Sequence, residues 1–271
     1  MSILSLNCRG LGNPRVIQFL KELVSQKKPS CIFLCETPCS RERVEYVRCL
    51  LGFEGGFAVD AHGRSGGIAL LWHKVDEVSL LSYSSNHIDV MIRSVGPYEY
   101  RLTGIYGEPN RSLRNRTWEL IRTLQMQRDS PWCLIGDFNN IISHEDKRGG
   151  LPYPNWLVQG FQDVIQECGL HDINLIGYQF TWEASRGTDR WIEVRLDRGL
   201  ANQKWLDFFP LAKLFNLEVS SSDHCPLLLD PCYRQRVFLH RGFKFENAWI
   251  RELLCQQIIE NSWNSCRGRS F

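Results

Sequence analysis

Short apolar runs alternate with amphipathic segments along the chain, and Gly, Asn, Ser and Pro separate them. Continuous apolar runs predict buried strands, whereas apolar residues three and four positions apart predict helices. The expected strands are residues 3–6, 31–34, 66–72, 78–83, 88–92, 98–106, 132–135, 180–182, 191–196 and 225–229. The expected helices cover residues 16–24, 118–124, 157–168 and 250–259.

The order of these elements predicts the fold class. Several strands follow one another between residues 66 and 106 with only turn signals between them, which predicts antiparallel pairing. Helices are interspersed in both halves of the chain, which argues against a purely parallel, doubly wound sheet. The sequence therefore predicts an α/β (α+β) fold in which two packed mixed β-sheets are flanked by helices.

Length and composition favour one main domain, since 271 residues with 43% hydrophobic content can bury one large core. The N-terminus lacks a signal-peptide pattern, and no stretch approaches the roughly 18 apolar residues of a membrane span. Together with the eleven cysteines, which form no CxxC pair, these features predict a protein of a reducing compartment, nuclear or cytoplasmic, with no membrane partner. Cys31 and Cys35 share one face of a predicted strand, so we expect them to be buried rather than to bind a metal with Cys39.

The net charge of +2 hides an asymmetry along the chain. Residues 1–232 carry 25 Lys and Arg against 27 Asp and Glu, whereas residues 233–271 carry 7 against 3. Because the larger part is not basic, phosphate must be bound by local clusters rather than by bulk charge. A solvated surface is the alternative interpretation of each cluster. The clusters are Arg111, Arg114 and Arg116, then Lys147 and Arg148, then Arg186 and Arg190.

Polar residues suited to phosphate chemistry stand where the predicted strands begin or end. Each has a local alternative, such as a turn, a helix cap or a surface ion pair. Because one sheet edge can bring several strand ends together, we expect these side chains to converge. They are Asn7, Glu36, Tyr106, Asp137, Asn139, Asp197 and the pair Asp223-His224.

Six short motifs that contain these residues occur in a particular order, at residues 7–11, 35–37, 104–107, 136–139, 195–198 and 222–226. In this order they resemble the endonuclease/exonuclease/phosphatase superfamily, and most closely its apurinic-endonuclease-like branch. Within that branch they resemble the endonuclease domain of plant-type LINE (non-LTR) retrotransposon polyproteins. The resemblance covers about residues 1–232. It implies a four-layer sandwich, a Mg²⁺ cofactor with Mn²⁺ as the alternative, and DNA as the partner.

The resemblance also implies a metal site. Hard divalent cations prefer carboxylate oxygen and retain several waters, so one or two protein carboxylates suffice. Glu36 is the expected ligand, and Asp223 or Asn7 completes or supports the ligand set. Apurinic endonucleases carry a further acid two positions after the first Asn, where this chain has Arg9. We therefore do not expect that contribution to the metal site.

Hydrolysis of a phosphodiester also requires a deprotonated water and a stabilised leaving oxygen. By resemblance, Asp197 orients the imidazole of His224, and either His224 or Asp137 takes the proton from water. The remaining residues expected to contact phosphate or substrate are Asn7, Tyr106, Asn139, Asn110 and Arg186. The interval from Tyr106 to Asn110 is one residue longer than in apurinic endonucleases, which argues against abasic-site specificity.

These observations leave three hypotheses. The first is a Mg²⁺-dependent endonuclease that nicks DNA, with target preference set by residues 110–116, 146–155 and 184–190. The second keeps the site but acts on a phosphorylated small molecule or a lipid headgroup. The third is a non-catalytic remnant of a mobile element, in which residues 233–271 are a basic, linker-like tail upstream of a missing reverse transcriptase. No protein partner is implied, and the oligomeric state stays open.

Overall fold

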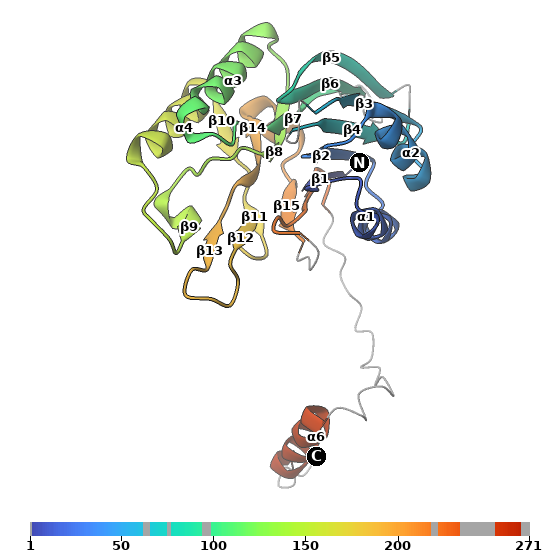
Figure 1. Ribbon diagram of the computed structural model, residues 1–271, viewed down its shortest axis with the longest axis vertical. Coiled ribbons are helices and arrows are strands. Elements are labelled where there is room, and N and C mark those ends of the chain that lie inside the picture. Colours follow the sequence, from blue (N-terminus) through green and yellow to red (C-terminus); the bar gives the residue numbers. More distant parts are fainter. Residues whose placement is uncertain are drawn as a thin grey trace. The chain divides into compact units, whose positions relative to one another are not determined.

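The computed structural model describes residues 2–61, 66–74, 77–93, 99–217, 222–233 and 253–266 (Figure 1). The chain divides into two compact units, residues 1–233 and 234–271. In the second unit the structure describes one helix, α6 (Leu253–Cys266). This helix extends beyond the expected 250–259, of which residues 250–252 lie outside the described residues. Among the described residues, no helix is long and apolar enough to cross a membrane.

The first sheet of unit 1 has seven strands and contains the N-terminal strand. Strand β1 pairs parallel with β2 and antiparallel with β16, which makes the sheet mixed. In spatial order the strands are β11 (Leu175–Ile176), β15 (Lys213–Asn216), β16 (Leu227–Asp230), β1 (Ile3–Asn7), β2 (Cys31–Cys35), β4 (Ile68–Trp72) and β3 (Gly55–Val59).

The second sheet has six strands and is also mixed, because β7 pairs parallel with β8 and antiparallel with β6. In spatial order its strands are β10 (Leu170–Asp172), β14 (Asp197–Asn202), β8 (Trp132–Asp137), β7 (Glu99–Tyr106), β6 (His87–Arg93) and β5 (Val78–Ser84). A separate small sheet pairs β12 (Trp182–Ala184), β13 (Ile192–Val194) and β9 (Lys147–Arg148).

Helices cover the outer face of each large sheet, as Figure 1 shows. Helices α1 (Pro14–Lys27) and α2 (Arg41–Leu51) pack on the first sheet, and α3 (Asn115–Gln127) and α4 (Asn155–Glu167) on the second. A short helix, α5 (Gln203–Phe208), follows β14, and 3₁₀ turns lie at Arg111–Leu113 and His144–Asp146. Helix α1 begins where the Asn13 side chain accepts from the backbone N–H of Arg15 and Pro14 opens the first turn.

The largest hydrophobic cluster lies between the two sheets and joins inward-facing side chains of both. Phe33 of the first sheet and Leu102 of the second belong to it, and both are fully buried. Cys31 and Cys35 also belong to this cluster, so the prediction that both would be buried on one strand face is confirmed. The four-layer arrangement of helices, sheet, sheet and helices is likewise the predicted fold class.

Two strand predictions were wrong. Residues 66–72 do not join the antiparallel run that follows them, because β4 pairs with β2 and β3 in the first sheet. Only β5, β6 and β7 form that run; residue 98 of its last expected strand lies outside the described residues. Asp197 does not end a strand over 191–196 but begins β14, whose partner is β8. Strand β13 belongs to the small sheet, so the chain changes sheets at residues 195–196.

Several short elements were not expected from the sequence. Helix α2 carries many charges, so its buried residues Val44, Val47 and Leu51 make only a weak stripe. The strands β3, β9, β10, β11, β14 and β15 were also missed, since runs of two to six residues give little periodicity.

Candidate functional site

Strand pairing brings the predicted polar residues to neighbouring strand ends. In the second sheet, Tyr106 and Asp137 are register partners at the ends of the parallel strands β7 and β8. Asp197, the first residue of β14, is the register partner of Asp137 on its other side. In the first sheet, Asn7 ends β1 beside Cys35 of β2, and Glu36 follows directly. The topology therefore places carboxylates of both sheets at one edge.

The side chain of Asn7 joins the two sheets and is fully buried. Its Nδ2 group donates to Glu36 Oε1 at 2.9 Å and to Asp137 Oδ2 at 3.0 Å. The same nitrogen lies 3.4 Å from Nε2 of His224. One neutral amide thus lies in contact with two carboxylates and an imidazole, all of which sequence analysis had assigned to the site.

The imidazole of His224 lies between two carboxylates. Its Nδ1 atom is 2.9 Å from Asp197 Oδ2, and its Nε2 atom is 3.9 Å from Asp137 Oδ2. Burial by itself would lower the pKa of His224, but the negative charges, Asp197 foremost, outweigh it and raise this pKa to about 9. Burial and the charge of Asp197 raise the pKa of Asp137 to about 6, although His224 and Asn7 oppose the increase.

The alternative interpretation of Asp197, a surface ion pair with the flanking arginines, is wrong. Asp197 is 3% exposed. Arg195 and Arg198 instead pair with Asp172, and Arg198 also pairs with Asp146. The arginines hold neighbouring loops, and the Asp197 carboxylate contacts the imidazole.

A tight turn after β8 fixes the carboxylate of Asp137. The backbone N–H of Asn139 donates to Asp137 Oδ1 at 2.8 Å, and its side-chain Nδ2 donates to the carbonyl of Gly107 at 2.9 Å. Asn139 adopts a left-handed conformation with φ of 52°, which Asn tolerates better than most residues. Gly136, the residue of β8 before Asp137, has φ of +148°, and a Cβ there would lie 2.0 Å from the Ile105 carbonyl oxygen, so this strand position requires glycine.

On the other side of Asn7, Glu36 contacts a phenol and a guanidinium. Tyr106 donates its hydroxyl to Glu36 Oε1 at 3.2 Å, and burial followed by the charge of Glu36 raises the pKa of this phenol. Arg9 Nε lies 3.5 Å from Glu36 Oε2, and its Nη1 is paired with Asp223 Oδ2. Trp182 Nε1 donates to the same Asp223 oxygen at 2.9 Å.

Two donor sets in this site could hold a metal ion. Asp137, Asp197 and His224 each offer an atom within 4.8 Å of the others. In that set, however, His224 Nδ1 and Asp197 Oδ2 already satisfy each other, and all three residues are buried, whereas Mg²⁺ retains several waters.

The second set comprises Glu36 and Asp223, which hold the cationic guanidinium of Arg9 between them. Asp223 Oδ1 is buried and has no hydrogen-bond partner among the described residues. Two carboxylates that already hold a positive charge, with one oxygen unpartnered, fit a hard divalent cation.

Two predicted substrate contacts do not reach this group. The Asn110 side chain caps the 3₁₀ turn at Arg111–Leu113 by accepting from the Ser112 N–H at 3.1 Å. Arg186 lies in the hairpin between β12 and β13, where its Nη1 is 3.4 Å from Glu183 Oε1. Neither residue lines the cleft described next.

Glu36, Asn139 and His224 open into a cleft of about 500 Å³. Its other walls are formed by cationic and apolar side chains, including Trp182, which sequence analysis had treated only as a strand residue. An isolated β-bridge between Trp182 and His224 brings this indole to the site, and no sequence signal predicts it. The remaining lining residues are Arg9, Pro109, Arg111, Arg114, Lys147, Leu151, Tyr153, Ile192, Val194 and Leu196.

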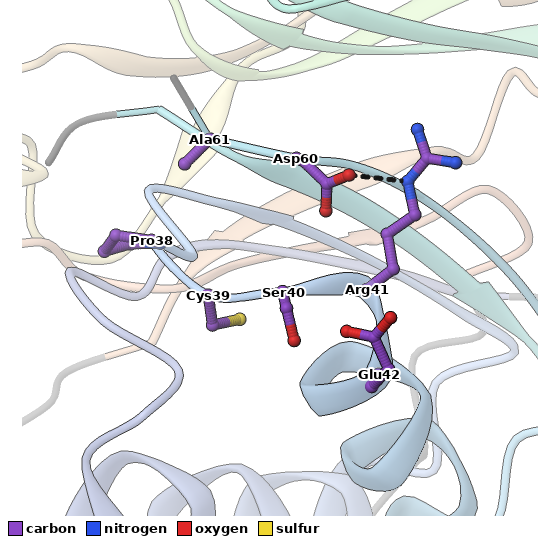
Figure 2. Close-up of a pocket in the computed structure, with 7 residues that line it drawn as sticks. All are labelled: Pro38, Cys39, Ser40, Arg41, Glu42, Asp60 and Ala61. Atoms are coloured by element: carbon purple, nitrogen blue, oxygen red, sulfur yellow. Dashed lines mark ion pairs between the residues drawn. The ribbon is translucent and has the colours of Figure 1, made fainter. Parts of the chain in front are cut away.

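A second pocket, of about 410 Å³, lies at the start of α2 (Figure 2). Its charged side chains largely neutralise one another, since Arg41 Nε lies 2.9 Å from Asp60 Oδ2, a pair that Figure 2 marks. The residues that line it include no histidine and no amide side chain. The cleft at His224 is therefore the better candidate for phosphate chemistry.

Comparison with solved structures finds the same fold in several nucleases. The endonuclease domain of TRAS1, a telomere-specific non-LTR retrotransposon, matches with a TM-score of 0.63 and 18% identity, covering 86% of this chain and 99% of that one. An AP endonuclease from Archaeoglobus fulgidus matches with a TM-score of 0.66 and 16% identity, covering 85% and 98%. The 3′-5′ exonuclease NExo from Neisseria meningitidis matches with a TM-score of 0.65 and 18% identity, covering 85% and 99%.

A search of curated proteins finds no match. The model of the Endonuclease/Exonuclease/phosphatase family, by contrast, matches residues 4–224, which span every group of the site from Asn7 to His224. Enzymes of this family generally use divalent metals, in agreement with the carboxylates at the cleft. From its N-terminal strand to the histidine at the site, the chain belongs to the Endonuclease/Exonuclease/phosphatase family.

Proposed function

We propose that this protein is a divalent-metal-dependent phosphodiesterase that nicks one strand of DNA. The observation that carries the proposal is the contact network from Asn7 through Asp137 and His224 to Asp197. It supplies a carboxylate, an amide and an oriented imidazole in mutual contact, and the imidazole of His224 lines the cleft. Those groups meet two needs of phosphodiester hydrolysis, activation of water and neutralisation of charge on phosphorus.

In this proposal Glu36 and Asp223 hold the metal, Mg²⁺ in preference to Mn²⁺, and Asn7 supports Glu36 through its 2.9 Å hydrogen bond. When bound, such an ion polarises a phosphoryl oxygen and offsets the negative charge that develops there. Arg9 must leave at least one of its two carboxylates for the ion to be held.

Asp137 is the better general base, because the pKa values separate the two candidates. A pKa of about 9 keeps His224 protonated near neutral pH, so both ring nitrogens are donors and neither can accept a proton. Asp137, with a pKa of about 6, is ionised at neutral pH and lies in the range that favours a general base. Asn139 holds its carboxylate, and Asp197 holds the imidazole for contact with a phosphate oxygen.

Tyr106 completes the proposed site as a hydrogen-bond donor. Burial and the nearby Glu36 raise the pKa of its phenol, so the hydroxyl keeps its proton. It can therefore donate to phosphate or to the leaving oxygen, as the resemblance implies.

DNA is the proposed substrate, and a retrotransposon is the proposed origin. The order of motifs resembles retrotransposon endonucleases, and the TRAS1 endonuclease domain shares the fold over 86% of this chain. A further structure with the same fold is NExo bound to a product DNA hairpin, with a TM-score of 0.64. A nucleus-associated role follows from this substrate.

The test is conversion of supercoiled plasmid to open circles by the full chain with Mg²⁺. Glu36→Ala and His224→Ala should each abolish nicking, as should a chelator. The matched control is Glu119→Ala, because Glu119 is an exposed acid of α3 outside the cleft. Undiminished nicking by both site variants would refute the assignment, and turnover of p-nitrophenyl phosphate without nicking would favour a small-molecule phosphatase.

A further inference from the structure

We infer that Arg111, Arg114 and Lys147 form a second anion site in the cleft, which binds a backbone phosphate other than the one being cleaved. This inference rests on the proposed function and specifies its substrate as a nucleic-acid strand. The three cations come from separate elements: the 3₁₀ turn after β7, the residue before α3, and β9. All three line the same cleft as Asn139 and His224.

The ring of Tyr153 brings the two arginines together. The Cζ atoms of Arg111 and Arg114 lie 5.5 and 5.4 Å from its centroid, and Arg114 Nη1 donates to its hydroxyl. The Tyr153 hydroxyl also lies 3.5 Å from the carbonyl oxygen of Asn139. The cationic cluster therefore adjoins the turn that holds Asp137.

The positive charge of this cluster is not balanced by ion pairs among the described residues. Among the described residues, no carboxylate forms an ion pair with any of the three, whereas the neighbouring Arg148 pairs with Glu193. Burial and the charge of Arg111 lower the pKa of Lys147, and the same two causes lower the pKa of Arg114, although Tyr153 and the charge of Asp137 oppose them. The cations thus destabilise one another, and an anion between them would relieve that repulsion.

Arg114 is the buried member of the cluster. It is only 7% exposed, yet its Nε atom has no hydrogen-bond partner among the described residues. A buried cation without a counter-ion costs free energy, and contact with Tyr153 satisfies only its Nη1 group. An oxyanion ligand would supply both the missing charge and an acceptor for the free N–H.

The cluster also discriminates between substrate classes. If the three cations form a separate anion site, a molecule with one phosphate can occupy either that site or the Asp137 and His224 group, but not both at once. A nucleic-acid strand carries one phosphate per nucleotide and can do both. The apolar wall at Trp182, Ile192 and Val194 suits the sugar and base faces between two phosphates.

The test is binding of a fluorescent DNA duplex to the full chain in chelator, measured by anisotropy over a range of NaCl concentrations. Each lost phosphate contact should lower the slope of log affinity against log salt by about 1. We expect this change for Arg111→Met and for Lys147→Met. The matched control is Arg128→Met, which removes an equal charge from an exposed position at the C-terminal end of α3 outside the cleft.

Replacement of single phosphates in the DNA identifies the phosphate that the cluster contacts. On a duplex that carries a mapped nick site, one phosphate at a time is replaced by a neutral methylphosphonate. At one position near the nick, replacement should weaken wild-type binding roughly tenfold and leave the affinity of Lys147→Met unchanged. Replacement of that phosphate should likewise leave the affinities of Arg114→Lys and Arg114→Met unchanged. Thermal unfolding checks that both variants are folded.

The outcomes separate this inference from the function on which it rests. If the wild type binds DNA and the salt slopes of Arg111→Met and Lys147→Met equal that of the wild type, the second site is overturned and the nuclease proposal stays intact. An equal loss for Arg128→Met would show that the effect comes from bulk charge, which would also overturn the second site. Absence of DNA binding and nicking by the wild type would overturn both.

Discussion

His224 Nδ1 lies 2.9 Å from Asp197 Oδ2, and both side chains are buried at the edge where the two sheets meet. The hydrogen bond fixes the ring orientation, and the carboxylate charge favours the protonated imidazole. We therefore propose that Asp197 is a positioning residue that acts through His224.

Asp197→Asn should lower the nicking rate under single-turnover conditions by roughly 100-fold, because an amide cannot stabilise the imidazolium as a carboxylate does. Affinity for DNA should change little. Since the carboxylate raises the pKa of His224, its loss should lower that pKa, which NMR titration of the metal-free protein can measure. A wild-type rate together with an unchanged titration would contradict the assigned role.

Most of the candidate site could be predicted because its residues occupy strand ends, which short apolar runs reveal. Asn7, Glu36 and Asp137 were placed correctly, since β1, β2 and β8 are continuously apolar and buried. The predicted convergence required that parallel neighbours end at the same edge of a sheet and also that the two sheets pack face to face. Asp197 was assigned to the site, but at the wrong end of the wrong strand, because the chain changes sheets just before it.

The features that escaped prediction depend on contacts between distant segments. The indole of Trp182 donates to Asp223, 41 positions further along the chain, where a β-bridge pairs Trp182 with His224. The pairing of Arg9 with Asp223 spans 214 positions. Periodicity reports only which face of an element is buried, so neither contact leaves a pattern in the sequence.

Gly136→Ala should destabilise the protein strongly. A Cβ at this position would meet a backbone carbonyl at 2.0 Å, and neither strand can move without breaking the pairing of β7 with β8. We expect a loss of about 3 kcal/mol or more in the free energy of unfolding, measured by urea denaturation. Gly12→Ala is the control, since a Cβ there meets nothing within 4 Å. Equal stability of the two variants would refute the steric argument.

His87 predicts a pH dependence of stability away from the site. Its ring is 5% exposed, with Nε2 and Nδ1 at 3.0 and 2.8 Å from the hydroxyls of Ser82 and Ser84. Burial lowers the pKa of His87; the charge of Asp89 opposes this decrease and the charge of Arg101 adds to it, so the folded state disfavours the protonated ring. The stability that neutral His87 contributes should be complete above its pKa in the unfolded chain, about 6.5. It should be lost as the pH falls through the lower pKa of His87 in the folded protein.

This contribution can be measured by comparing wild type with His87→Gln in urea denaturation between pH 5 and 8. Glutamine keeps polar contacts but does not titrate. The stability of the wild type should fall more steeply than that of the variant below pH ~6.5. Parallel curves over the whole range would show that His87 does not titrate with unfolding.

The ion pairs of Arg9 affect how tightly the proposed site binds a metal ion. The Arg9 guanidinium contacts Glu36 and Asp223, so a metal ion must compete with it for at least one of these carboxylates. Arg9 is 56% exposed, and a partly exposed ion pair contributes at most about 1 kcal/mol. Arg9→Met should therefore strengthen binding of Mn²⁺ or Mg²⁺ roughly fivefold in calorimetric titration. Arg9→Asp, which restores the acid found in apurinic endonucleases, should strengthen it further, whereas Arg43→Met on α2 should have no effect. Weaker binding by Arg9→Met would instead mean that the guanidinium holds the two carboxylates in position for the ion.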